Sequence, residues 1–106
     1  MISESRLQQS LTYLAETDEP AAKAKGLMEG LKNQEKSILA AAFLETDGTV
    51  AEREARSRVS PDFTKWRETY ENAVLMYETV KNKRNTEATV IEVWRSLNAS
   101  RRVGNL

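Results

Sequence analysis

The sequence SPDFTKWRETYENAVLMYETVKNKRNTEATVIEVWRSLNASRR, residues 60–102, decides the fold. Ser60 can accept a hydrogen bond from a free backbone N–H, and Pro61 suits the first helical position because no donor is needed there. Apolar side chains then recur at intervals of three or four residues: Phe63, Trp66, Tyr70, Ala73, Tyr77 and Val80. This spacing is typical of a helical stripe that packs against other helices. We therefore predict a long helix over about residues 61–102, either continuous or bent near Asn85.

The rest of the chain predicts further helices and no strands. Leu7, Leu11 and Leu14 indicate a short N-terminal helix that ends near Thr17–Pro20, and an apolar face over residues 20–45 indicates a second long helix. Gly48 suits a left-handed turn, and Thr49 with Glu52 forms a capping-box pattern that begins a connecting helix over about residues 49–58. The predicted fold is all-α: an antiparallel helical hairpin with a long C-terminal helix, a short connecting helix and an N-terminal helix. We expect a single domain over residues 1–106.

The last part of the long helix is expected to extend beyond its partner. If the chain turns at Thr17–Pro20, residues 84–102 have no neighbouring helix, although they remain rich in apolar side chains. Exposed apolar patches of this kind usually mark contacts, so we expect a homo-oligomer. Candidate interface residues are Val90, Ile91, Trp94 and Leu97, together with Gly26 and Gly30. The alternative is that the first helix continues into the second and covers this segment within one subunit.

Gly26 and Gly30 are candidates because glycine is costly inside a helix. Each costs about 0.5–1 kcal/mol relative to alanine, so a pair four residues apart is consistent with close approach of another backbone. The same pair is equally compatible with a solvated helix face.

Composition argues against several classes of function. The chain has sixteen basic and sixteen acidic residues, no cysteine and no histidine, so sulfur-based metal sites, thiol nucleophiles and the commonest general base are absent. Carboxylate pairs such as Glu52 with Glu54 and Glu68 with Glu71 lack an evident third metal ligand. We predict no catalytic residues, no metal and no cofactor. With neither a signal-like N-terminus nor a membrane-length apolar run, we expect a cytoplasmic protein that does not enter a membrane.

Charge is distributed unevenly along the chain. Residues 1–48 carry five basic and eight acidic side chains, whereas residues 81–106 carry six basic and two acidic ones. The candidate phosphate-binding residues are Lys81, Lys83, Arg84, Arg95, Arg101 and Arg102. Trp94 could add a surface on which an unpaired base stacks, or it could be a core residue in line with Ile91 and Leu97.

Four segments resemble a group of small tailed-phage proteins from the early region. They are Gly48–Ala55, the run Lys81-Asn82-Lys83-Arg84, Ile91–Asn98 and the closing residues Arg101–Leu106, and the resemblance covers roughly residues 27–106. Genes of this group lie near those for single-strand annealing and single-strand binding proteins. The resemblance implies a role in phage DNA recombination or replication, in the cytoplasm of the host cell. It assigns no activity and no functional residue.

Two functions follow as hypotheses. The first is a non-enzymatic, oligomeric accessory of phage DNA recombination or replication, whose basic C-terminal region contacts single-stranded DNA or the protein bound to it. The second is a protein-interaction module that binds a host protein and inhibits or adapts it, with Trp94 in the contact.

Overall fold

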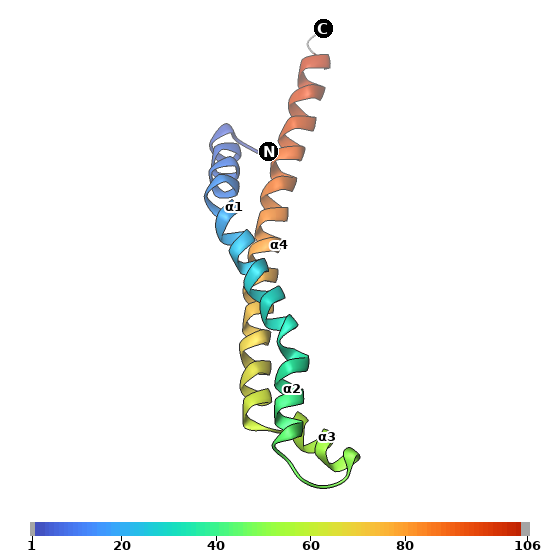
Figure 1. The fold of residues 1–106 in the computed structure, drawn as a ribbon. Helices are drawn as coiled ribbons and strands as arrows, with labels where there is room; N and C mark the ends of the chain where they lie inside the picture. Colours follow the sequence, from blue (N-terminus) through green and yellow to red (C-terminus); the bar gives the residue numbers. More distant parts are fainter. Residues whose placement is uncertain (1, 105–106) are drawn as a thin grey trace. The chain divides into compact units, whose positions relative to one another are not determined.

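The structure is a computed structural model that describes residues 2–104. These residues form four helices: α1 (Glu4–Asn33), α2 (Glu35–Leu44), α3 (Val50–Arg58) and α4 (Pro61–Gly104) (Figure 1). The described residues contain no strand, so the predicted all-α class is confirmed. The long C-terminal helix and the short connecting helix lie where the sequence placed them, and α4 continues through Asn85 without interruption.

Hydroxyl side chains cap the start of three helices. The Arg6 N–H donates to Ser3 Oγ at 3.0 Å, the Glu52 N–H to Thr49 Oγ1 at 3.2 Å and the Phe63 N–H to Ser60 Oγ at 3.3 Å. Each hydroxyl satisfies a backbone donor that the first helical turn leaves without a partner. Before α3, Gly48 has a φ of 121°, which a residue with a side chain rarely adopts.

The boundaries of the first two helices differ from the prediction. Helix α1 runs through Pro20 instead of ending at Thr17–Pro20, although proline removes a backbone donor inside the helix. The break comes later, at Gln34, whose N–H bonds back three residues to the Leu31 carbonyl at 3.1 Å. That same carbonyl accepts a 2.7 Å hydrogen bond from the Trp66 indole N–H. The Trp66 indole is therefore a second donor to the Leu31 carbonyl, at the point where the helix is interrupted.

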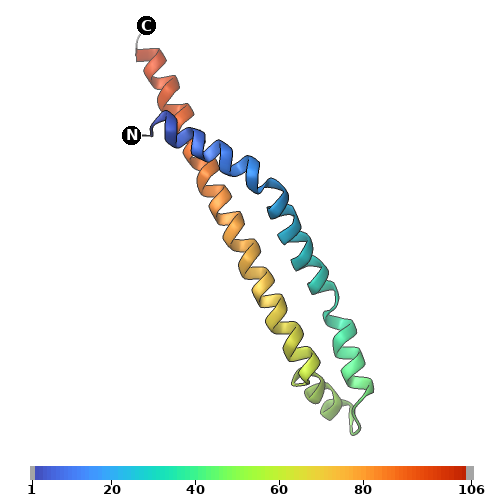
Figure 2. The ribbon, with the colours of Figure 1, turned by 90° about the vertical axis from the view of Figure 1, so that its left-hand side faces the viewer.

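The chain divides by its contacts into two compact units. The central unit comprises residues 23–77, and the terminal unit comprises residues 2–22 with 78–104 of the described chain. The prediction of one domain stays a prediction. Within each unit, a segment of the first part of the chain lies beside a segment of α4 (Figures 1 and 2).

The central unit contains the apolar core. Among residues 2–104, the buried apolar side chains are Ala42, Phe63, Trp66 and Ala73, and all belong to this unit. The Trp66 ring stacks between those of Phe63 and Tyr70, with centroids 5.3 and 5.2 Å away. At the end of α2, Arg53 of α3 donates from Nη2 to the Phe43 carbonyl at 3.0 Å, and its guanidinium lies over the Phe43 ring. This cation offsets the negative end of the α2 dipole.

Candidate interaction surface on the terminal unit

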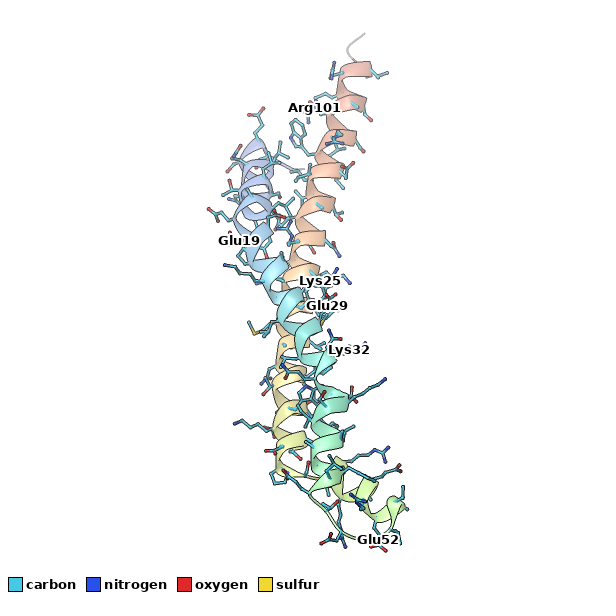
Figure 3. All side chains as sticks on the ribbon, viewed as in Figure 1. Glu19, Lys25, Glu29, Lys32, Glu52 and Arg101 are labelled. Atoms are coloured by element: carbon cyan, nitrogen blue, oxygen red, sulfur yellow. The ribbon has the colours of Figure 1, made fainter. Side chains whose placement is uncertain are left out.

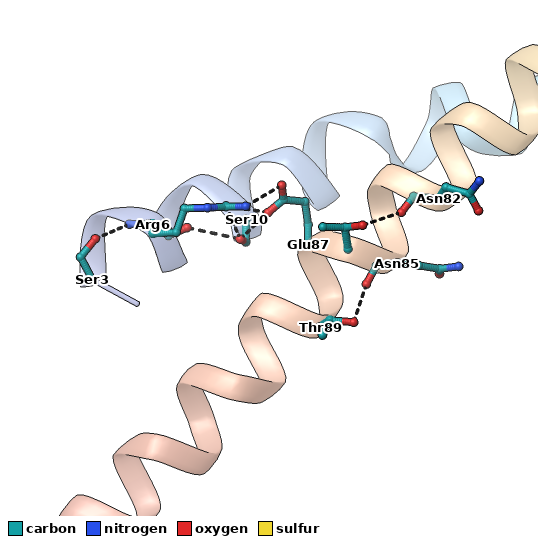
Figure 4. A network of polar contacts seen from close by, with 8 residues as sticks. Ser3, Arg6, Ser10, Asn82, Asn85, Glu87 and Thr89 are labelled. Atoms are coloured by element: carbon teal, nitrogen blue, oxygen red, sulfur yellow. Dashed lines mark hydrogen bonds and ion pairs between the residues drawn. The ribbon is translucent and has the colours of Figure 1, made fainter. Parts of the chain in front are cut away.

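A polar network holds α1 against α4 in the terminal unit (Figure 4). Arg6 donates to both carboxylate oxygens of Glu87, from Nη1 to Oε2 at 2.6 Å and from Nη2 to Oε1 at 2.9 Å. Ser10 is fully buried, accepts from Arg6 Nη1 at 2.8 Å and lies 2.6 Å from Glu87 Oε2, to which its hydroxyl can donate. A two-pronged arginine–carboxylate contact fixes orientation as well as distance. The network therefore sets which residues of α1 and α4 lie opposite each other.

The network also shifts the acidity of its charged members. Hydrogen bonds from Arg6 and then from Ser10 hold the pKa of the Glu87 carboxyl below its ordinary value, against the opposing effect of burial. The hydrogen bond with Glu87 raises the pKa of Arg6. Both groups therefore stay charged at neutral pH, and the contact is an ion pair.

Arg84 makes a second attachment between the same helices. Its Nη1 donates to the Leu14 carbonyl at 2.8 Å and to Thr17 Oγ1 at 2.6 Å, and its Nη2 lies 3.4 Å from Asp18 Oδ1. Because residues 14–18 pair with Arg84 while residues 6–10 pair with Glu87, α1 and α4 run antiparallel here. Arg84 was a candidate phosphate contact, but the structure directs its guanidinium to α1 and leaves its side chain 23% exposed.

Residues 84–102 have a neighbouring helix within the chain, contrary to our expectation. We expected the chain to offer residues 84–102 no neighbour, because a turn was predicted at Thr17–Pro20. Helix α1 continues instead, as the alternative prediction stated, and its first half lies against this part of α4. Val90, Ile91 and Trp94 are consequently half-buried within one chain. The interface predicted at these residues stays a prediction, but the absence of a neighbour no longer supports it.

Two grooves border this part of α4. The first, of about 360 Å³, lies between the start of α1 and α4; it is lined by Ile2, Ser3, Glu4, Trp94, Leu97, Asn98 and Arg101. The second, of about 550 Å³, runs along α4 alone; it is lined by Asn85, Ala88, Thr89, Glu92, Val93, Ser96 and Leu97. Val93 and Leu97 are each 42% exposed. Helix α1 therefore covers one face of this segment and leaves another apolar face open.

The remaining basic candidates are exposed. Arg101 lies near the C-terminal end of α4 (Figure 3), where Arg102 is also exposed. Arg95 is exposed and lies 3.3 Å from Glu92 on the same helix. Two lysines earlier along α4, Lys81 and Lys83, are also exposed. At about 100° per residue, Arg95 and Arg102 share a face whereas Lys83 points elsewhere. The structure brings these cations onto one segment but not onto one face.

Gly26 and Gly30 lie in the central unit, apart from the other interface candidates. Both are exposed, and a Cβ atom added at either position would meet nothing within 4 Å. The described chain therefore makes no close approach to these glycines. Their role in an interface with another molecule stays a prediction.

No match to this chain is found among protein-family models, curated proteins or solved structures. Within the described range, no cluster of three or more acidic residues is arranged to hold a metal ion. Nor does any helix in that range combine the length and apolar character that crossing a membrane requires. The geometry of the terminal unit is thus the basis for inferring what the protein does.

Sequence reasoning missed the residues that hold this unit together. Arg6 and Glu87 gave no signal, because 77 residues or more separate the two sides of the network and one sequence does not show which residues of two helices lie opposite each other. A serine at position 10 within the Leu7–Leu14 seam was the one available hint, since a small polar residue on an apolar seam needs a partner.

Proposed function

We propose that the protein is a non-enzymatic binding protein whose terminal unit presents the open apolar face of α4 to a partner protein. One observation carries this proposal. The segment around Val93 and Leu97 has apolar side chains on more than one face, and α1 occupies only one of them. Contiguous apolar surface on a small protein usually marks a contact, because leaving it in water is unfavourable.

The form of the open face indicates what it can bind. It follows a single helix, and Val93 and Leu97 line it together with polar residues such as Asn85 and Ser96. A partner helix with its own apolar stripe fits such a surface, since ridges of side chains pack into the grooves between them. The resemblance to phage early-region proteins supports a role for this binding in phage DNA recombination or replication, or in the control of a host protein.

A capture experiment tests this function. The full chain, its Val93→Glu variant and its Leu11→Glu variant are immobilised and exposed to nuclease-treated bacterial extract. Leu11 is 44% exposed and lies on α1, so it matches Val93 in exposure but not in position. The proposal expects one protein, or the chain itself, to be retained stoichiometrically by the unmodified chain and by Leu11→Glu, but not by Val93→Glu. Equal retention by all three would contradict it.

Binding of single-stranded DNA is the second candidate function, and a different observation favours it. Trp94, Asn98 and Arg101 line one groove, which combines a ring for base stacking with a cation for a phosphate. Glu4 lines the same groove and opposes a phosphate there. Titration of a labelled oligonucleotide at two salt concentrations tests this function. Binding that weakens at higher salt and is reduced by Arg101→Gln supports it, and no binding at low salt removes it.

A further inference from the structure

Helix α2, in the central unit, is apolar on every side. Residues 38–44 are consecutive apolar residues, and at about 100° per residue this run goes more than once around the helix. A helix of this kind is normally buried all round. The structure buries Ala42 of α2, whereas Leu44 is 76% exposed and Ala40 and Ala41 are also exposed. The rest of the described chain therefore covers only part of this apolar helix.

The uncovered part of α2 adjoins a groove between α2 and α3, which pack against each other (Figure 1). The groove has a volume of about 300 Å³ and is lined by Leu39, Ala40, Phe43, Glu54, Ser57 and Arg58. The Ser57 hydroxyl donates to the Arg53 carbonyl of its own helix at 2.7 Å, so this buried polar group is already satisfied. A volume of this size equals that of about ten water molecules, and an apolar side chain of another molecule can fill part of it.

Opposite charges border the groove. Glu54 and Arg58 lie four residues apart on α3, and both are exposed. Among residues 2–104, neither side chain has a hydrogen bond, an ion pair or a ring contact. A second pair at the same spacing on α3, Glu52 with Arg56, does approach to 3.9 Å. The two charges at the groove are thus available to another molecule.

We propose that this groove is a second docking site, which receives a helix of a partner protein. An apolar side chain of that helix enters between α2 and α3, as ridges of side chains enter the grooves of a neighbouring helix. Glu54 and Arg58 are about 6 Å apart along α3, so the partner helix carries a basic and an acidic side chain about one turn apart to pair with them. The site lies in the central unit and does not depend on the open face of α4.

Three synthetic peptides serve as the probes. Each is an alanine-based helix of about fifteen residues with two leucines four residues apart, and the position after each leucine carries a charge. One peptide has a glutamate and a lysine at these positions, the second has two glutamates and the third has two lysines. Fluorescence anisotropy of the labelled peptide measures binding to the full chain. The mixed-charge peptide should bind about threefold tighter than either of the others, and added salt should reduce this difference.

Reversing one charge of the groove tests the pairing. Arg58→Glu leaves two carboxylates at the groove, so the two-lysine peptide should then bind about threefold tighter than the mixed-charge peptide. Glu54→Arg should give the opposite change and favour the two-glutamate peptide. Both positions are exposed, so circular dichroism of both variants should stay helical.

A neutral substitution tests the apolar part of the groove. Ala40→Gln should weaken binding of the mixed-charge peptide at least about fivefold, because a longer polar side chain occupies the place of the leucines. Ala41→Gln is the matched control, since Ala41 is also exposed but lies about 160° around α2 from Phe43. This control should leave the affinity unchanged.

The remaining outcomes contradict the proposed site. No binding of the mixed-charge peptide at chain concentrations up to about 1 mM, or equal affinity for the three peptides, overturns it. Binding that Val93→Glu abolishes would place the peptides on α4, which overturns this inference and leaves the proposed function standing. A dimer in light scattering that Ala40→Gln dissociates would place a second copy in the groove and would also overturn it.

Discussion

At the scale of single residues, each unit is stabilised by its own chemistry. Trp66 and its aromatic neighbours fill the central unit, whereas the fully buried side chain of the terminal unit is that of Ser10, between Arg6 and Glu87. A satisfied polar network favours one arrangement over others, because any shift in register leaves buried polar atoms without partners. We infer that this network serves mainly to select the pairing of α1 with α4.

The first prediction concerns Glu87→Gln. The pKa of Glu87 is lowered in the folded chain, so the stability it contributes is present above the ordinary glutamate pKa of about 4.3 and is lost as the pH falls through the lower folded value. The variant should have a lower melting temperature than the unmodified chain at neutral pH. That difference should shrink in acid, as followed by circular dichroism across the pH range.

A matched control for this prediction is Glu92→Gln, which alters an exposed carboxylate one turn or so further along α4. It should change the melting temperature little, since exposed ion pairs contribute little. A melting-temperature difference for Glu87→Gln that persists unchanged below the glutamate range would show that the ion pair is not its cause.

The second prediction concerns Trp66→Phe, which removes the indole N–H while keeping an aromatic ring. The Leu31 carbonyl keeps its contact with the Gln34 N–H, so the loss should be near one hydrogen bond, about 1 kcal/mol, plus the cost of the smaller ring. Denaturant titration measures this change. The half-buried Trp94, changed to phenylalanine, serves for comparison and should cost less, and a larger cost there would contradict the placement of the core.

At the scale of helices, the sequence predicted where helices begin better than where they end. The caps at Thr49 and Ser60 and the stripe through Phe63 and Trp66 depend on neighbours in sequence, and they are confirmed. The continuation of α1 past Thr17–Pro20 was only the alternative prediction, because the contacts that attach residues 14–18 to α4 come from Arg84, which is 66 residues or more away in sequence. The break at Gln34 was missed for a similar reason, since the Leu31 carbonyl at the break also accepts a hydrogen bond from Trp66, far along the sequence.

The glycines of the helices and turns give a third prediction. Gly30→Ala should stabilise the chain by about 0.5–1 kcal/mol, because the position is helical and open. Gly48→Ala should destabilise it, because φ is 121° there and the new Cβ would lie 2.6 Å from Glu52 Oε2. Thermal denaturation measures both. If Gly30→Ala instead lowers the mass measured by light scattering, the glycine lies in an interface after all.

At the scale of the whole molecule, the two units should differ in local stability. The central unit contains the buried apolar side chains of the described chain, and the terminal unit depends on polar contacts and half-buried residues. Regions with little buried apolar surface open at lower free energy. Hydrogen exchange read by mass spectrometry should therefore be faster for residues 5–18 than for residues 63–76.

Hydrogen exchange should also depend on the protein concentration. If α4 pairs with a second copy, residues 86–100 should become more protected from exchange as the concentration rises, because binding stabilises the folded form. Residues 63–76 should not respond. Uniform exchange in both units would contradict the division of the core described above.

The position of the two tryptophans has a practical consequence. Trp66 lies in the central unit and is 7% exposed, whereas Trp94 lies in the terminal unit and is half-buried beside a groove. Each indole is thus a built-in optical probe of its own unit. In chains that keep only one of them, the emission of Trp66 should be bluer than that of Trp94, and a quencher in solution should reach Trp94 first.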